Sequence, residues 1–88
     1  MSVYQLPEVL DHLAAVRTAE DLLQRRGHDL RVDGFYLQRV SAQGLEVLLA
    51  AQRQWQEDGF SIKFTHFSPE VCEGIGRLGL AKLLELEV

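Results

Sequence analysis

A strand gives way to a helix at residues 40–45, which read VSAQGL. Upstream, residues 30–33 alternate in polarity around a β-branched valine, as a short strand does. Downstream, large apolar residues recur at helical spacing, at Leu45, Leu48, Leu49 and Trp55. The turn therefore lies at a helix N-terminus, where free backbone N–H groups and the helix dipole favour negative charge. Such a turn can bind or carry a phosphate.

The same alternation of strand and helix runs along the whole chain. We expect strands over residues 3–6, 30–33 and 61–65, and helices over 12–26, 42–58 and 68–78, followed by a short turn or helix at 80–84. Strands that alternate with helices of these lengths indicate βαβ units and a parallel sheet. The sequence thus predicts one compact α/β domain over residues 1–88, with a small mixed, mostly parallel sheet and about four helices.

Helix boundaries and buried faces follow from particular residues. Asp11 is a suitable N-cap for the first helix, and Ser68 with Pro69 is a strong start for the third. Pro7 limits the first strand to a sheet edge. We expect the first helix to bury one apolar stripe, formed by Leu13, Val16, Ala19, Leu22 and Leu23. The second is expected to bury Leu45, Leu48, Leu49, Ala51 and Trp55, and the third Val71, Cys72, Ile75 and Leu78.

Composition excludes several classes of function. A net charge of −4 argues against nucleic acid as a partner, because phosphates require a basic surface. The single cysteine, Cys72, excludes an intramolecular disulfide and a multi-cysteine zinc site. His12, His28 and His66 lack metal-ligand spacing, so we expect no metal and no cofactor. Without a phosphate-binding glycine loop or a catalytic motif, we expect no enzyme.

We expect no signal peptide at the start of the chain, and no apolar run approaches about 18 residues. These features predict a cytoplasmic protein without direct membrane insertion.

Three segments resemble the STAS domain, the fold of bacterial anti-sigma-factor antagonists and of sulfate-transporter tails. Residues 6–11, LPEVLD, resemble the entry to the family's first helix. Residues 30–45 match a family run of strand, aspartate, loop and Asp-Ser-x-Gly-Leu, and residues 67–69 and 78–80 resemble its last helix start and its closing Leu-Gly-Leu. The resemblance covers most of residues 6–84 and implies a small, stand-alone bacterial STAS-like domain.

The chain departs from this family at its regulatory position. Ser41 stands where the family has the aspartate of Asp-Ser-x-Gly, and Ala42 stands at the phospho-acceptor position. Alanine has no hydroxyl, so the resemblance implies that the usual phosphorylation switch is missing. For Ser41 two interpretations stay open, a helix N-cap and a displaced phosphosite or anion ligand.

The loop before this turn is aromatic, at Phe35 and Tyr36, beside Gln38 and Arg39. Tyrosine and arginine are enriched in interface hot spots. We therefore predict a partner-binding surface that comprises Phe35, Tyr36, Arg39, Ser41, Ala42, Gln43 and Gly44. In the alternative interpretation, Phe35 or Tyr36 covers the core of the sheet.

The resemblance implies a non-catalytic protein–protein interaction module in bacterial signalling, similar to an anti-sigma antagonist or a chemotaxis-associated adaptor. Its partner would be a kinase or a component of a receptor array. Two alternatives are a cytoplasmic regulatory subunit of a lipid or solute transport complex, bound to its ATPase, and a sensor of a small ligand such as a nucleotide or lipid. A homodimer is compatible with any of these functions.

Overall fold

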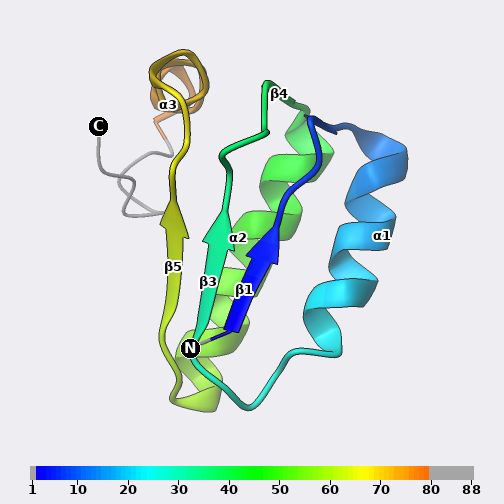
Figure 1. The fold of residues 1–88 in the computed structure, drawn as a ribbon, viewed down its shortest axis with the longest axis vertical. Coiled ribbons are helices and arrows are strands. Elements are labelled where there is room, and N and C mark those ends of the chain that lie inside the picture. The colour runs from blue at the N-terminus through cyan, green and yellow to red at the C-terminus, as the bar shows by residue number, and fades with distance from the viewer. Residues whose placement is uncertain (1, 80–88) are drawn as a thin grey trace.

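Parallel strands form one layer of the structure (Figure 1). The computed structural model describes residues 2–79, in which β1 (Ser2–Gln5), β3 (Leu30–Asp33) and β5 (Ile62–Thr65) form one sheet in the order β1-β3-β5. As predicted, β1 is an edge strand. Because all three strands are parallel, their carboxyl ends meet at the same edge of the sheet.

A second, shorter pairing extends this edge. β2 (Val9–Leu10) pairs in parallel with β4 (Arg39–Val40). The Gln38 N–H donates to the Glu8 carbonyl at 2.7 Å, and the Ser41 N–H donates to the Leu10 carbonyl at 2.9 Å. These strands were not predicted, because two residues are too few to show a period. Every strand pair within residues 2–79 is parallel, so this part of the chain shows no mixed sheet.

Three helices complete the described fold: α1 (His12–Leu23), α2 (Ala42–Asp58) and α3 (Pro69–Arg77). About four were predicted; the fourth, at 80–84, lies outside the described residues. The predicted N-caps are confirmed, since the Asp11 carboxylate accepts from the Ala14 N–H at 3.0 Å and the Ser68 hydroxyl from the Val71 N–H at 3.2 Å. α1 ends three residues before the predicted position 26.

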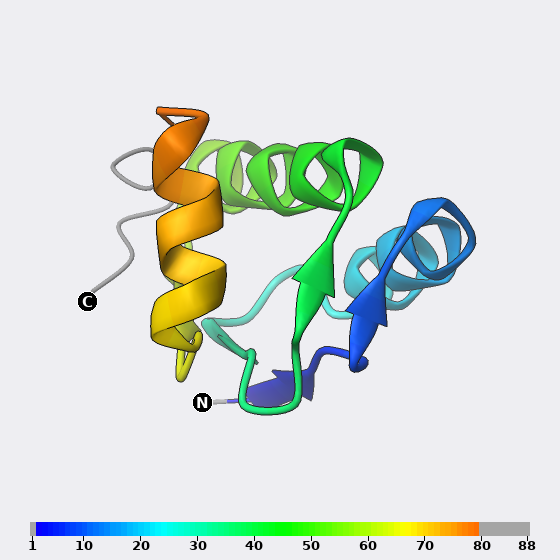
Figure 2. The same cartoon turned by 90° about the horizontal axis from the view of Figure 1, so that it is seen from above.

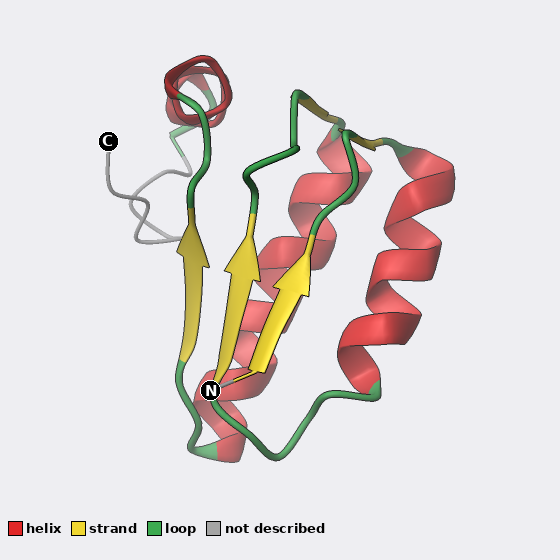
Figure 3. Cartoon of the chain, viewed as in Figure 1, coloured by secondary structure: helices red, strands yellow, loops and turns green. Residues whose placement is uncertain are grey.

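The helices α1 and α2 lie side by side over one face of the sheet, and the chain runs down both in the same direction (Figures 2 and 3). Between sheet and helices, a core forms from buried side chains of both layers, including Leu22, Leu30, Val32, Leu45, Leu48, Trp55 and Phe64. The Trp55 indole N–H reaches the His28 carbonyl at 2.8 Å, which satisfies its buried donor.

The predicted buried stripe of α1 was largely wrong. Leu13, Val16 and Leu23 are 78%, 53% and 61% exposed, whereas Leu22 is buried as predicted. The helix instead turns a face centred on Ala15, Thr18 and Leu22 toward the core. Ala15 and Thr18 are small, and Thr18 is also polar. The hydropathy pattern therefore does not identify this face.

In the other helices the predicted faces are mostly confirmed. Leu45, Leu48, Ala51 and Trp55 are buried in α2, and Val71, Cys72 and Ile75 are buried in α3. Leu49 is only half-buried, and Leu78, the C-cap of α3, is 63% exposed.

The first turn of α2 packs on β2 at Gly44. A Cβ atom on this residue would lie 2.5 Å from the Leu10 carbonyl oxygen and 2.7 Å from Leu10 Cγ. Real Cβ atoms do not approach other atoms this closely. Gly44 therefore sets the distance between α2 and β2.

We predict that Gly44→Ala lowers the free energy of unfolding by about 1–3 kcal/mol, because the backbone of Leu10 must move. Gly74→Ala is the matched control, since Gly74 lies in α3 and no atom of the described residues 2–79 comes within 4 Å of an added Cβ atom. That change should raise the free energy of unfolding by up to about 1 kcal/mol through helix propensity. Denaturant unfolding of the two variants checks this, and equal effects would contradict the packing argument.

Candidate functional site

The loop between β3 and β4 has a fixed backbone at the carboxyl edge of the sheet. The Asp33 carboxylate accepts from the Phe35 N–H at 2.9 Å, and the Gly34 N–H donates to the Thr65 carbonyl at 2.8 Å. The Leu37 N–H closes the turn on the Gly34 carbonyl at 3.0 Å. Because Leu37 is 1% exposed, it anchors the loop in the core. The loop is therefore held at both ends and in its middle.

Two aromatic rings project from this loop into solvent. Phe35 is 67% exposed and Tyr36 is 57% exposed. Their rings meet edge to face, with centroids 5.2 Å apart and planes at 87°, an arrangement that aromatic pairs prefer. Neither ring covers the core, because Leu37 fills that position. The alternative interpretation, in which one of the two caps the sheet, is thus wrong.

The first turn of α2 holds the other predicted site residues. The Ser41 hydroxyl accepts from the Gly44 N–H at 3.1 Å, so Ser41 is the N-cap of α2. Ala42 and Gln43 are exposed, whereas Gly44 is buried against Leu10. Gly44 is therefore part of the scaffold beneath this surface.

β4 separates the aromatic pair from the helix start. It crosses from the sheet layer to the helix layer, with the aromatic loop before it and Ser41 after it (Figure 2). Arg39, which is exposed, lies on β4 between the two. The structure thus brings Phe35 and Tyr36 together and places Ala42 and Gln43 at the far end of the same short strand.

His66 adjoins the site and was not predicted to belong to it. It follows β5 directly, and its Nδ1 lies 3.3 Å from the Asp33 carboxylate that also holds Phe35. Its φ of 61° is uncommon for a residue other than glycine, although histidine adopts it more often than most. The sequence could have predicted this approach, because Asp33 ends β3 and His66 directly follows β5, and neighbouring parallel strands end at the same edge of the sheet.

Little in the described part of the chain suggests reactive chemistry. Within residues 2–79, no three side chains of His, Cys, Asp or Glu lie close enough together to hold a metal ion. Burial raises the pKa of the Cys72 thiol, which disfavours the nucleophilic thiolate. None of the helices described is long and apolar enough to cross a membrane.

Comparison with known families identifies a related domain. A family model described as "Mlab, STAS domain" matches residues 5–85. The match covers the described chain from the end of β1 to the end of α3, and so includes the aromatic loop, β4 and the start of α2. No curated protein matches the chain.

We expect Ser41→Ala to lower the free energy of unfolding by about 1 kcal/mol, because α2 loses its N-cap. Ser41→Asp is the matched control and should stay within about 0.5 kcal/mol of the wild type, since aspartate caps a helix equally well. Denaturant unfolding measures both. If Ser41→Asp destabilises the domain as much as Ser41→Ala, the hydroxyl of Ser41 acts by something other than capping.

Proposed function

The chain belongs to the STAS domain family, and from this membership we propose that it is a non-catalytic module that binds another protein through the carboxyl edge of its sheet. STAS domains are in general non-enzymatic and typically mediate protein–protein interactions. The proposed docking surface comprises the predicted residues that the solvent reaches, namely Phe35, Tyr36, Arg39, Ala42 and Gln43, together with the half-buried Ser41.

The exposed aromatic pair is the observation that carries this proposal. Phe35 and Tyr36 leave most of their surface in water, where it contributes nothing to folding. Buried aromatic anchors supply much of the free energy of binding in protein interfaces. Because hydrogen bonds to the Asp33 carboxylate and to and from the Gly34 backbone already fix the loop, a partner need not order it. Such preorganisation reduces the entropic cost of association.

Ala42 distinguishes this surface from a phosphorylation switch. A phosphate on the first turn of a helix would add a charge of about −2 to the surface. Position 42 cannot receive one, because alanine has no hydroxyl. We therefore infer constitutive docking, or regulation by means other than a phosphate at position 42. Ser41 is the alternative phosphate position, although its oxygen already accepts the N-cap hydrogen bond.

The identity of the partner distinguishes a signalling module from a transport subunit or a ligand sensor. We propose a partner in bacterial signalling, a kinase or a receptor-array component, in the cytoplasm. Recovery of an ATPase would favour the regulatory subunit of a transport complex instead. A ligand sensor would show itself as thermal stabilisation by a nucleotide or a lipid.

We predict that the double variant Phe35→Ala, Tyr36→Ala weakens partner binding at least about tenfold, because it removes both aromatic anchors. The matched control is Phe60→Ala, which removes a ring that is 40% exposed before β5, at the opposite edge of the sheet. Each protein is tagged and purified from the organism that encodes it, and the bound partner is quantified. Retained binding in the double variant, or equal loss in the control, would contradict the proposed surface.

A further inference from the structure

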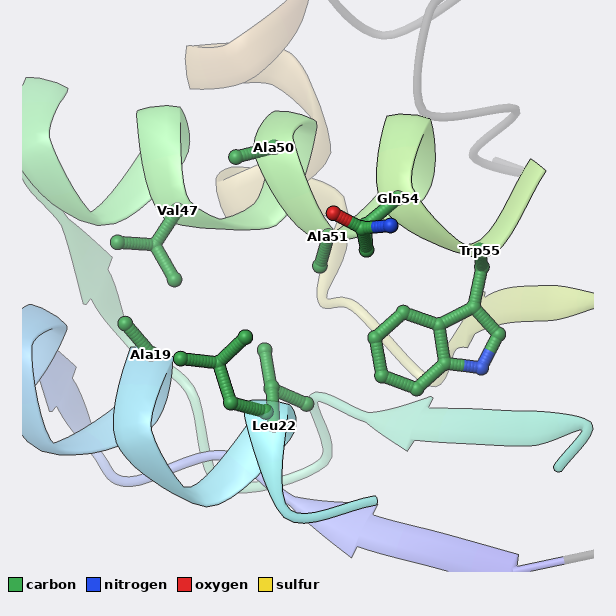
Figure 4. Close-up of a pocket in the computed structure, with 8 residues that line it drawn as sticks. Ala19, Leu22, Val47, Ala50, Ala51, Gln54 and Trp55 are labelled. Atoms are coloured by element: carbon green, nitrogen blue, oxygen red, sulfur yellow. The ribbon is translucent and has the colours of Figure 1, made fainter. Parts of the chain in front are cut away.

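A second apolar surface lies on the helix layer, between α1 and α2. Val16 and Leu23 belong to the apolar stripe of α1 that does not enter the core, and they are 53% and 61% exposed. Val47 of α2 points toward Ala19 of α1 (Figure 4), and Ala50 of α2 lines the same surface. We call this surface the α1–α2 groove and define it by Val16, Ala19, Leu23, Val47 and Ala50.

The groove is long enough for several turns of a helix. It comprises two hollows of about 200 and 530 Å³, which share Ala19, Leu23, Val47 and Ala50. Its lining runs from the first turns of α1 and α2, at His12 and Gln43, to their last turns. At 1.5 Å per residue, positions 12–23 of α1 span about 16 Å, or three helical turns.

Contacts at both ends of α1 set its position relative to α2. Arg26, just after α1, forms a two-pronged ion pair with Asp58 at the end of α2, with both N–O distances 3.0 Å. The guanidinium lowers the pKa of Asp58, and Gln54 donates to the same carboxylate at 3.0 Å. At the other end, β2 leads directly into Asp11, the N-cap of α1, and Leu10 of β2 packs against Gly44 in the first turn of α2. The spacing of the two helices is thus fixed before a partner arrives.

The charge around the groove is acidic. Glu20 of α1 and Glu46 of α2 are exposed and line the larger hollow. No lysine or arginine lines either hollow within the described chain. A second copy that placed the same surface against this one would bring glutamates toward glutamates, which like-charge repulsion disfavours. A partner segment with an apolar face flanked by lysines or arginines would complement both the apolar lining and the glutamates.

We propose that the α1–α2 groove binds a basic amphipathic helix of a partner protein. The small side chains Ala19 and Ala50 leave room for apolar residues at i, i+3 or i+4 and i+7 of such a helix, and flanking lysines or arginines reach Glu20 and Glu46. This binding is independent of Phe35 and Tyr36, although Gln43 at the mouth of the groove also belongs to the proposed docking surface.

Two synthetic helices of about 14 residues test this proposal. Both carry leucines at i, i+3, i+4 and i+7; one has lysines and the other glutamates at the remaining positions. Titrated into the isotope-labelled protein, the leucine–lysine peptide should shift the backbone amide resonances of Val16, Ala19, Val47 and Ala50 and bind at least about tenfold more tightly than the leucine–glutamate peptide.

Substitutions in the groove test whether the peptide binds there. Val16→Gln with Leu23→Gln removes apolar surface, and Glu20→Lys with Glu46→Lys reverses the acidic charge; each pair should weaken binding of the leucine–lysine peptide at least about fivefold. Leu13→Gln, outside the groove and 78% exposed, is the apolar control. Glu57→Lys, near the end of α2 and not in its lining, is the charge control. Both controls should change binding less than about twofold.

Several outcomes would overturn the proposal. These are equal losses in the controls, equal affinity for the two peptides, resonance shifts confined to β1, β3 and β5, and a dimer in solution whose contacts include Val16 and Leu23. Because the aromatic pair is intact in all these variants, failure here leaves docking through Phe35 and Tyr36 to its own test.

Discussion

The close contact between Gly44 and Leu10 is the constraint on which the site depends. It brings the first turn of α2 against the backbone of β2, where no side chain fits. β2 in turn pairs with β4, so the contact fixes the path of the chain from the aromatic loop to the helix start. A larger residue at position 44 would displace α2 and, with it, Ala42 and Gln43 at the surface.

Rigid placement of exposed residues links this fold to binding. The Asp33 carboxylate contacts two residues. It accepts a hydrogen bond from the Phe35 N–H and lies 3.3 Å from Nδ1 of His66. The Asp33 carbonyl accepts from the Leu6 N–H at 2.9 Å, which ties the loop to the chain after β1. Apolar surface that stays exposed on a rigid loop is typical of an interaction site. A protein interface therefore explains the exposed aromatic rings most directly.

The sequence predicted the parts of the fold that have strong local signals. Asp11, Ser41 and Ser68 all cap helices, and Gly59 ends α2 in the left-handed conformation, because capping depends on a few neighbouring residues. The face that α1 buries depends on its packing against α2 and β2, and no local pattern encodes it. For the same reason, the sequence did not reveal the α1–α2 groove. The approach of His66 to Asp33 could have been predicted, because the two residues end neighbouring parallel strands.

Amide hydrogen exchange of the protein, alone and in complex with the partner it co-purifies with, tests the central claim most directly. The account predicts slower amide exchange on binding within residues 35–43, in the aromatic loop, β4 and the first turn of α2. Protection confined to α3 or to residues 59–61 at the opposite edge of the sheet, with no change in residues 35–43, would contradict it.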